Sequence, residues 1–467
     1  MLLFYFPYII VSYPAIFFED AHTQIIQAYQ ELGYVEPMYL KHHLLSEEVL
    51  LNNHHPIVHT LWLHLFIQFG NKVFHSINVG VFLFALLQLI LLLVTISYTA
   101  KILIQKYQVK EIYILLMILY YAISPRIQNY MFVVTKDIYY SIFVLLFINF
   151  CSAILDEQSG KQAHIGFAVS AIGMLLFRNE GKYVIIATCF LMAILYRKIW
   201  KKMTGYILFF VLFSFIFSQF LFAFKITPGG KREMLSVPLQ QTARYVRDYA
   251  DEVTEEEREA ISDVVHYSKL GEDYNPDVSD SAKWTFRDYA TKEELTAYAE
   301  AWLSMFKKHP GVYIQATMNN YYAYFYSKGQ PFEGCTYQLS QECMDIMNNK
   351  LLPLEIAFSY PEGLEEVRNA YEKYREEFSK IPIVSLLMMP ETYTWLMIIL
   401  LFYTIKHKNQ KALALQVMPI VILMVCLVGP CNGYYCRYLY PIMICLPAII
   451  PRINYFIMKN NSGLEEK

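Results

Sequence analysis

The sequence predicts an all-α polytopic membrane protein, and three observations support this fold class. Of the 467 residues, 56% are hydrophobic and only 17% are charged, whereas charged residues make up about 25% of soluble proteins. The apolar residues form blocks of about 15 to 28, long enough to cross a hydrocarbon core of about 30 Å. The net charge of -2 and the lack of a zinc-type Cys/His spacing argue against a nucleic-acid partner.

Ten hydrophobic blocks are candidate transmembrane helices. They cover residues 2–18, 77–104, 112–124, 134–155, 164–177, 183–197, 205–226, 385–405, 412–429 and 438–457. The blocks at 112–124 and 164–177 are short, and such runs also suit a buried or re-entrant helix. The first block has neither a basic start nor a small-residue cleavage site, so we expect a span there and not a signal peptide.

Basic residues predict the orientation of these spans. Lysine and arginine gather in four short loops, at 101–110, 161, 197–202 and 406–411. With ten spans all four loops lie on one side, and the positive-inside rule assigns that side and the C-terminal tail to the cytoplasm. The outer side then holds residues 19–76 and a large polar insertion at 227–384.

The spans and the insertion divide the chain into three predicted parts. Residues 1–226 form an N-terminal module of about seven spans, which includes the first outer loop. Residues 227–384 form the extracellular part, and residues 385–467 form a C-terminal module of three spans with a short tail. Thr254 and Thr291 each begin a capping box before apolar residues at helical spacing. The insertion is therefore predicted to be a small, mainly helical domain.

Acidic residues come directly after the first span. Glu19 and Asp20 begin a predicted amphipathic helix on the outer surface, with Gln24 on its polar stripe. A carboxylate at the mouth of a membrane-embedded site can take a proton from an acceptor hydroxyl or hold a divalent cation such as Mg or Mn. Asp20 is equally the type of residue that caps a helix. The local pattern leaves both roles open.

Histidines begin a second predicted surface helix. His55 and His59 share a face of this helix, and His54 precedes it. Histidines four residues apart can bind a metal, but no acidic third ligand accompanies them here. Hydrogen bonding to phosphate or sugar hydroxyls is the favoured interpretation, and anchoring at the membrane interface is the alternative.

Charged residues also lie at the outer ends of later spans. Lys136 and Asp137 begin an otherwise apolar helix just after Arg126, and ionisable residues at that depth are functional candidates because they are costly. The alternative is that Lys136 and Asp137 pin the helix at the interface.

Two further basic sites oppose the positive-inside rule. They contain Arg178 with Lys182, and Arg437 with Tyr438. An arginine fork suits a lipid phosphate, so Arg178 and Arg437 are candidate donor-binding residues. Snorkelling to ordinary headgroups is the alternative.

The arrangement of these residues resembles the GT-C superfamily of membrane glycosyltransferases. In that fold an acidic residue just after the first span, followed by surface helices, serves as catalytic base or metal ligand, and Asp20 with Glu19 occupies that place. A second outer loop often contains another acid, where this chain has Asp137. More closely, the chain is similar over nearly its whole length to an uncharacterised bacterial family of multi-span proteins, mostly of Gram-positive organisms. The motifs behind this closer similarity are Tyr13-Pro14 to Asp20, His54-His55-Pro56, Thr135-Lys136-Asp137, Arg178-Asn179, Val237-Pro238-Leu239-Gln240-Gln241 and His309-Pro310.

The resemblance implies transfer of a sugar from a polyprenyl-phosphate donor to an envelope glycan, lipid or protein at the outer face of the cell membrane. Asp20 would deprotonate the acceptor, and Asp137 would orient the acceptor or a metal. The donor phosphate would lie near Arg178, Lys182 or Arg437, with Lys136 and Arg126 as further cations. We therefore expect Asp20 and Asp137 to lie within about 15 Å of each other in one site, covered by residues 227–384.

Two alternative functions remain open. One is a polymerase or ligase of lipid-linked glycans, and the other is a transporter or flippase of lipid-linked saccharides. A transporter should place charged groups near the middle of several spans, whereas the charged residues named here lie at the outer ends of the predicted spans. The sequence therefore favours an enzyme.

Overall fold

The computed structural model describes residues 1–17, 19–31, 51–156, 159–287, 289–326, 339–352, 356–428 and 436–461. Within these ranges the chain is mostly helical, as the sequence predicts, and its named strands are two-residue segments that pair in parallel. One pair joins β1 (Ile16–Phe17) to β3 (Val133–Val134). The other joins β2 (Asn52–Asn53) to β4 (Thr227–Pro228). Each pair ties together segments that are far apart in the sequence.

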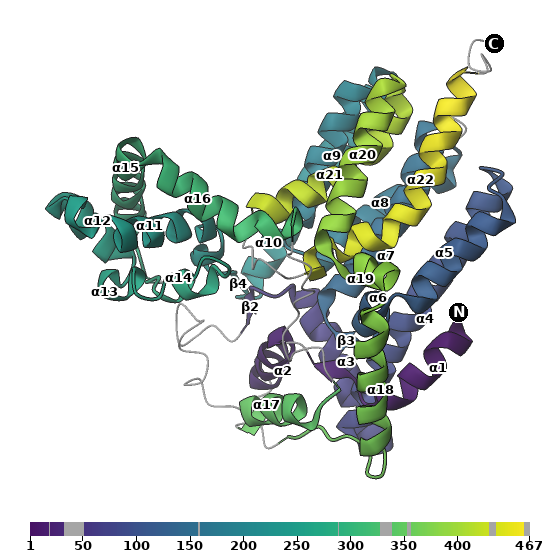
Figure 1. Cartoon of the computed structure of the whole chain (residues 1–467), viewed down its shortest axis with the longest axis horizontal. Coiled ribbons are helices and arrows are strands. Elements are labelled where there is room, and N and C mark those ends of the chain that lie inside the picture. Colours follow the sequence, from purple (N-terminus) through teal and green to yellow (C-terminus); the bar gives the residue numbers. More distant parts are fainter. Residues whose placement is uncertain are drawn as a thin grey trace.

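Five helices in these ranges are long and apolar enough to cross a membrane. They are α4 (Ile77–Gln105), α7 (Lys136–Leu155), α10 (Trp200–Ala223), α21 (Gln410–Val428) and α22 (Tyr440–Asn461). Each coincides with a predicted span. Figure 1 shows several of them side by side in one helical bundle, which indicates a helical membrane protein.

Four shorter apolar helices coincide with other predicted spans. They are α1 (Leu2–Val11), α5 (Glu111–Ile123), α8 (Lys161–Phe177) and α9 (Gly181–Leu195). The prediction of one continuous span over residues 2–18 is wrong, because α1 ends at Val11. Pro14 explains part of this, since a residue that precedes proline is disfavoured in the helical conformation. At 10 residues, α1 is roughly 15 Å long, about half the thickness of a hydrocarbon core.

The predicted span at 385–405 is also not one straight helix. Helices α19 (Pro382–Met388) and α20 (Pro390–Lys406) meet at an angle of 80°. Pro390 causes the break, because proline has no N–H to continue the helix and forces Met389 into an extended conformation. Arg126, on α6 (Pro125–Met131), donates from Nε and Nη2 to the Met388 carbonyl at 3.1 and 2.7 Å. Its guanidinium thus satisfies a carbonyl at the end of α19.

The bundle has a buried centre and an exposed rim. Helix α7 packs against α4, α8, α21 and α22, and 78% of its most apolar 18-residue stretch is buried. Helix α10 is equally apolar, but only 11% of the corresponding stretch is buried. A helix that is apolar on all sides is stable when protein or lipid surrounds it. We therefore place α7 at the core of the bundle and α10 at its exposed apolar edge.

The first part of the insertion forms a helical domain with its own core. It contains α11 (Ser236–Asp248), α12 (Glu255–Val264), α13 (Tyr267–Leu270), α14 (Asp280–Trp284), α15 (Lys292–Lys308) and α16 (Pro310–Tyr321). Tyr245, Tyr298 and Met305 are among the residues of its separate hydrophobic cluster. Both capping boxes, at Thr254 and Thr291, are confirmed. Figure 1 shows this domain projecting sideways out of the bundle, and we call it the outer domain for this position relative to the bundle.

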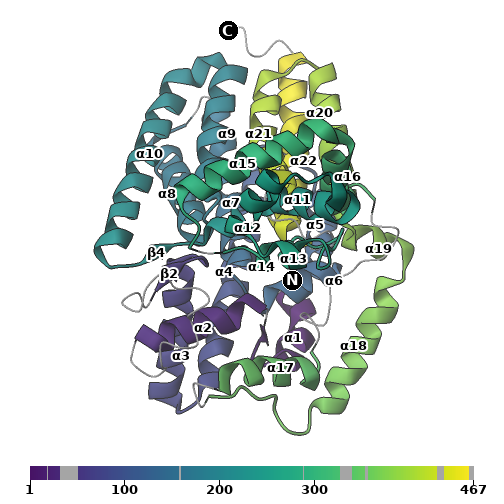
Figure 2. The same ribbon diagram turned by 90° about the vertical axis from the view of Figure 1, so that its left-hand side faces the viewer.

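The second part of the insertion packs elsewhere. Helix α17 (Gln341–Leu351) contacts α2 (Glu19–Glu31) and β1, and α18 (Glu365–Ser379) contacts α1. Its apolar residues join the large cluster of the bundle. Figure 2 shows α17 and α18 beside α1, α2 and α3 (Ile57–Phe74), below the outer domain. The insertion therefore supplies one projecting domain and one cover over the first helices of the chain.

Candidate functional site

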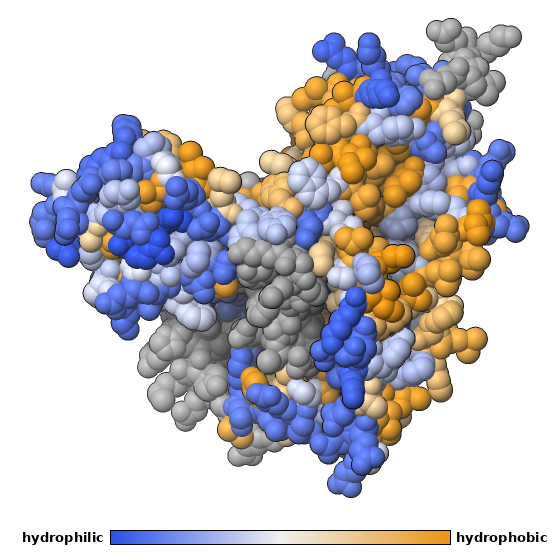
Figure 3. Space-filling model, in the orientation of Figure 1, coloured by the Kyte–Doolittle hydropathy of each residue, from blue (hydrophilic) through white to orange (hydrophobic). Residues whose placement is uncertain are grey.

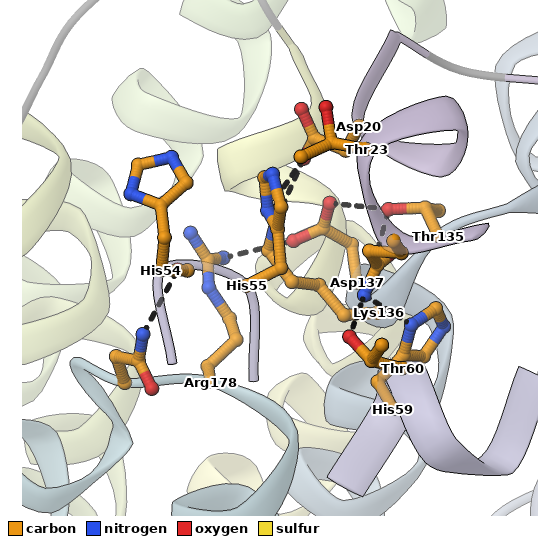
Figure 4. Close-up of polar contacts among 12 residues, drawn as sticks. Asp20, Thr23, His54, His55, His59, Thr60, Thr135, Lys136, Asp137 and Arg178 are labelled. Atoms are coloured by element: carbon orange, nitrogen blue, oxygen red, sulfur yellow. Dashed lines mark hydrogen bonds and ion pairs between the residues drawn. The ribbon is translucent and has the colours of Figure 1, made fainter. Parts of the chain in front are cut away.

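The parallel pairing of β1 with β3 brings the predicted acidic residues together. Parallel strands end on the same side, so the residues that follow β1 and β3 come out beside each other. Asp20 follows β1 in the first turn of α2, and Lys136 and Asp137 follow β3 at the start of α7. His55, which follows β2, lies against the same group (Figure 4).

Asp20 is the centre of the first ion-pair cluster. Its Oδ2 accepts hydrogen bonds from Lys136 Nζ at 2.7 Å and from Arg437 Nη1 at 3.1 Å. Arg437 comes from η8 (Cys436–Leu439), which immediately precedes α22. Burial alone would raise the pKa of Asp20, but Arg437 and Lys136 hold this pKa well below its usual range. Asp20 is therefore ionised, and both cations point at one carboxylate oxygen.

Asp20 is not at the N-cap position of α2, which was its alternative role. Helix α2 begins at Glu19, so Asp20 lies inside the first turn and not before it. A negative charge there is still favourable for the helix dipole. The side chain of Glu19 is not among the side chains that the structure describes.

His55 is part of this cluster in its neutral form. Burial and the neighbouring Lys136 lower the pKa of His55 well below 6.5. Its Nδ1 lies 3.2 Å from Lys136 Nζ. Because an ammonium can only donate, Nδ1 accepts this hydrogen bond and we assign the ring proton to Nε2. Lys136 therefore bridges Asp20 and His55.

Asp137 is the centre of a second cluster. Its Oδ1 forms an ion pair with Arg178 Nη1 at 3.3 Å, and Thr135, the N-cap of α7, donates to its Oδ2 at 2.9 Å. Arg178, which follows α8, also pairs with Glu180. Two tyrosine rings, those of Tyr140 and Tyr438, lie with their centroids 5.3 Å from the Arg178 guanidinium.

Tyr438 joins the two clusters. The Arg437 guanidinium lies 4.9 Å from the Tyr438 ring and donates to its hydroxyl at 3.1 Å. Tyr438 thus contacts both Arg437 and Arg178. Together with the adjacency of Lys136 and Asp137, this contact makes the clusters one continuous site of two carboxylates and three cations. We call it the outer cluster: Asp20, Lys136, Asp137, Arg178 and Arg437.

Gln24 and His59 lie beneath the outer cluster. Gln24 Nε2 donates to His59 Nδ1 at 2.9 Å and to Thr60 Oγ1 at 3.1 Å, and all three side chains are buried. Burial and Lys136 lower the pKa of His59 to about 3, so this histidine is neutral. These residues fasten α2 to α3. By holding α2 in place they position Asp20, and their own side chains are buried.

His54 borders the outer cluster through its backbone and its ring. Asn179, next to Arg178, donates to the carbonyls of Asn53 and His54 at 2.6 and 3.0 Å. The rings of His54 and His55 are in edge contact, with centroids 4.6 Å apart. The outer domain reaches the site here, because β4 pairs with β2 and the charges of Arg232 and Glu233 act on His54.

The metal-binding alternative has no support in the arrangement of ligands. In the part of the chain that the structure describes, no group of three or more His, Cys, Asp or Glu side chains could hold a metal ion. The Asp20 and Asp137 carboxylates face cationic side chains. As placed, they are paired with cations and do not form a metal-ligand set.

Two predicted donor-binding residues lie apart from these contacts. Arg126 is bonded to the Met388 carbonyl. Lys182 is exposed and lies over the ring of Tyr183 at 4.9 Å. Sequence reasoning assigned no role to Tyr140, although Tyr140 is four residues after Lys136 and therefore on the same face of α7.

Sequence reasoning also missed Arg452, a fully buried arginine on α22. Its guanidinium donates to the Asn149 side chain and to the Ala448 carbonyl and lies 5.1 Å from the ring of Tyr107. Arg452 is twelve residues after Tyr440, so it is about 18 Å along the helix from the outer cluster. An arginine inside an apolar block was the available signal.

Comparison with known proteins identifies a family for this chain. Residues 6–462 match the model of a family of unknown function (DUF6020), so the chain belongs to this family. No curated protein and no solved structure matches the chain.

Proposed function

We propose that this DUF6020 protein is a membrane glycosyltransferase that uses a polyprenyl-phosphate sugar as its donor at the outer face of the cell membrane. The observation that supports this most directly is the convergence of Lys136 and Arg437 on one oxygen of Asp20. Phosphate recognition needs such converging charged donors. A glycosyl transfer needs a carboxylate next to them.

The donor phosphate would take the place of the Asp20 carboxylate. A phosphate oxygen at the position of Asp20 Oδ2 would receive the same two hydrogen bonds from Lys136 and Arg437. Arg178, whose guanidinium lies 5.3 Å from the centroids of two tyrosine rings, would offer a third cation to the other phosphate oxygens. The polyprenyl chain would then lie along the apolar helices of the bundle.

Donor binding would also prepare Asp20 for its role as a base. A carboxylate with a pKa held well below its usual range is a weak proton acceptor. When a phosphate binds Lys136 and Arg437, their effect on Asp20 becomes weaker and its pKa rises. We therefore propose an ordered reaction in which the donor binds before the acceptor.

The transfer step follows from this arrangement. Asp20 takes the proton of the acceptor hydroxyl, and the acceptor oxygen forms a bond to the anomeric carbon of the donor sugar. The bond from that carbon to the phosphate oxygen breaks, and polyprenyl phosphate leaves with the electron pair. Asp137 accepts a hydrogen bond from Thr135, and its ion pair with Arg178 holds that arginine near the leaving phosphate.

The proposed placement in the membrane has ten membrane-inserted segments. They are the five long helices, the four shorter ones and the bent pair α19–α20. In this placement the outer cluster and residues 227–384 face the outside, and the C-terminus faces the cytoplasm.

A transporter or flippase of lipid-linked saccharides is the second candidate. The observation that favours it is Arg452, a charge in the middle of an apolar helix. However, the Arg452 guanidinium already bonds to protein groups on α7 and α22. A polymerase or ligase would use the outer cluster in the same way as the proposed transferase, with a longer acceptor.

The test is transfer by the purified protein in lipid nanodiscs. A set of polyprenyl-phosphate sugars is supplied with simple glycoside acceptors, and release of polyprenyl phosphate is measured. We expect acceptor-dependent release that Asp20→Asn abolishes and Lys182→Ala retains. The absence of release with every donor, together with protein-dependent movement of the donor between leaflets of proteoliposomes, would replace the transferase with the transporter.

A further inference from the structure

Helices α15 and α16 form one side of the outer domain. Figures 1 and 2 show α15 and α16 along this side, with α13 and α14 on the opposite side of the domain. Helix α16 continues into η5 (Tyr322–Tyr324) and then to Phe325. The Phe325 carbonyl accepts a hydrogen bond from Trp395 Nε1 at 3.0 Å. Because Trp395 lies near the start of α20, the end of α16 is fixed where α20 begins.

Helix α16 has an apolar residue on both of its faces. Val312, Tyr313 and Ala316 are buried in the core of the outer domain. On the other face Ile314 is 56% exposed and Met318 is 63% exposed. Residues four apart lie on the same side of a helix, so Ile314 and Met318 form one stripe.

Helix α15, which packs against α16, also has an exposed apolar residue. Leu303 is 45% exposed, and Lys307, one turn later, is also exposed. Figure 3 shows apolar surface on the upper edge of the outer domain, on the side nearer the apolar surface of the bundle. We call Leu303, Ile314 and Met318 the α15–α16 stripe.

The surroundings of the stripe indicate what covers it. The domain follows α10, in which Phe215 and Phe222 are more than half exposed, as is Phe224 just after the helix. At its other end the domain is fixed to α20, whose Trp395 and Phe402 are also exposed. The stripe thus belongs to a domain that is attached at both ends to helices with exposed apolar side chains. Exposed apolar surface of this kind marks an interaction site.

We infer that the α15–α16 stripe lies on the surface of the bilayer and fixes the outer domain to the leaflet that surrounds the outer cluster. Leu303, Ile314 and Met318 enter the boundary between headgroups and acyl chains, and Lys307 reaches the headgroup phosphates. The outer domain is then held flat against the membrane beside the site. This inference does not depend on the glycosyltransferase proposal.

The experiment uses a photo-crosslinking residue in the full chain. p-Benzoyl-phenylalanine replaces Ile314 or Met318, and in the control it replaces Trp284, which is 74% exposed on α14. Each protein is placed in nanodiscs of phosphatidylethanolamine and phosphatidylglycerol, irradiated, and analysed by mass spectrometry of the intact chain. All three positions are exposed, so the substitutions remove no buried contact.

The expected result is a mass increase of one phospholipid at positions 314 and 318, at least fivefold more frequent than at 284. Equal and low lipid labelling at all three positions would overturn the inference. Labelling at 314 that joins two chains would also overturn it, because a second copy would then cover the stripe. Size-exclusion elution at the volume of the unmodified protein shows that each variant is folded.

Discussion

The outer cluster has three cations in the bundle and the Arg452 site has one, and the partners of these cations differ in kind. In the outer cluster each cation contacts a carboxylate: Lys136 and Arg437 contact Asp20, and Arg178 contacts Asp137. Arg452 contacts an amide oxygen, a backbone carbonyl and an aromatic ring. An anion can replace the carboxylate in the first group, whereas the second has no anion to replace.

If the proposed function holds, this difference separates a binding site from a structural contact. A cation that is paired with a carboxylate can change partner when another anion arrives, since one ion pair replaces another. Arg452 is held by groups on α7 and α22, and its removal takes the charged donor away from the Asn149 side-chain oxygen in the interior. We therefore expect changes in the outer cluster to alter binding and turnover, and changes at Arg452 to alter stability.

The largest expected effect is that of Asp20→Asn on turnover. The amide keeps the shape of the side chain but cannot accept the proton of the acceptor, so the rate of polyprenyl-phosphate release should fall by about 10²-fold or more. Glu180→Gln is the matched control, because Glu180 pairs with Arg178 but does not contact Asp20. Full activity of folded Asp20→Asn protein would remove Asp20 as the base.

Arg437→Ala should act on donor binding first. The loss of a charged hydrogen-bond donor should weaken binding of the polyprenyl-phosphate sugar by about 1.5 to 3 kcal/mol. Arg437→Lys should recover part of this, because it restores the charge without the planar fork. Binding is measured by titration in detergent, with Lys182→Ala as the control. Equal weakening in Lys182→Ala would show a general effect of surface charge and not a phosphate site.

Arg452→Met should lower stability and leave donor affinity unchanged. The buried Asn149 side-chain oxygen loses its charged donor, and the Ala448 carbonyl keeps only the backbone bond of its helix, at a cost of about 1 to 3 kcal/mol. Thermal unfolding in detergent measures this loss. If Arg452→Met were as stable as the parent protein but bound the donor less tightly, Arg452 would belong to a transport path.

The smallest expected effect is on the pH profile. In the folded protein the pKa of Asp20 is depressed, so its ion pairs persist at pH 5 and are lost only as the pH falls through this lowered value. The profile of kcat/KM, which reports the free enzyme, should therefore be flat from about pH 5 to 7. His55 is neutral throughout this range. A fall in kcat/KM centred near pH 6.5 would mean that a histidine titrates in the free site.

Sequence reasoning could locate the helices and the charged ends because these signals are local. Apolar blocks predicted the membrane helices, and Thr254 and Thr291 predicted two capping boxes that the structure confirms. Lys136 and Asp137 stood out because they begin an apolar helix. The sequence also contains Pro390 within a predicted span, but only the structure shows the 80° bend next to this proline.

The contacts of the site could not be predicted, since they depend on distant segments. Asp20 and Arg437 are 417 positions apart, and Asp20 meets Lys136 through a pairing of two-residue strands that has no recognisable period. The same limit applies to Arg126, whose partner is a carbonyl at the end of α19. Only the tertiary structure separates that arginine from Arg437.

The most direct test of the central claim is the donor affinity of Asp20→Asn compared with the parent protein. If the donor phosphate takes the place of the Asp20 carboxylate, removal of that negative charge frees Lys136 and Arg437. The polyprenyl-phosphate sugar should then bind at least as tightly as to the parent protein, although turnover is lost. Weaker binding to folded Asp20→Asn protein would contradict the claim, because Asp20 would then be needed to position the two cations and not to compete for them.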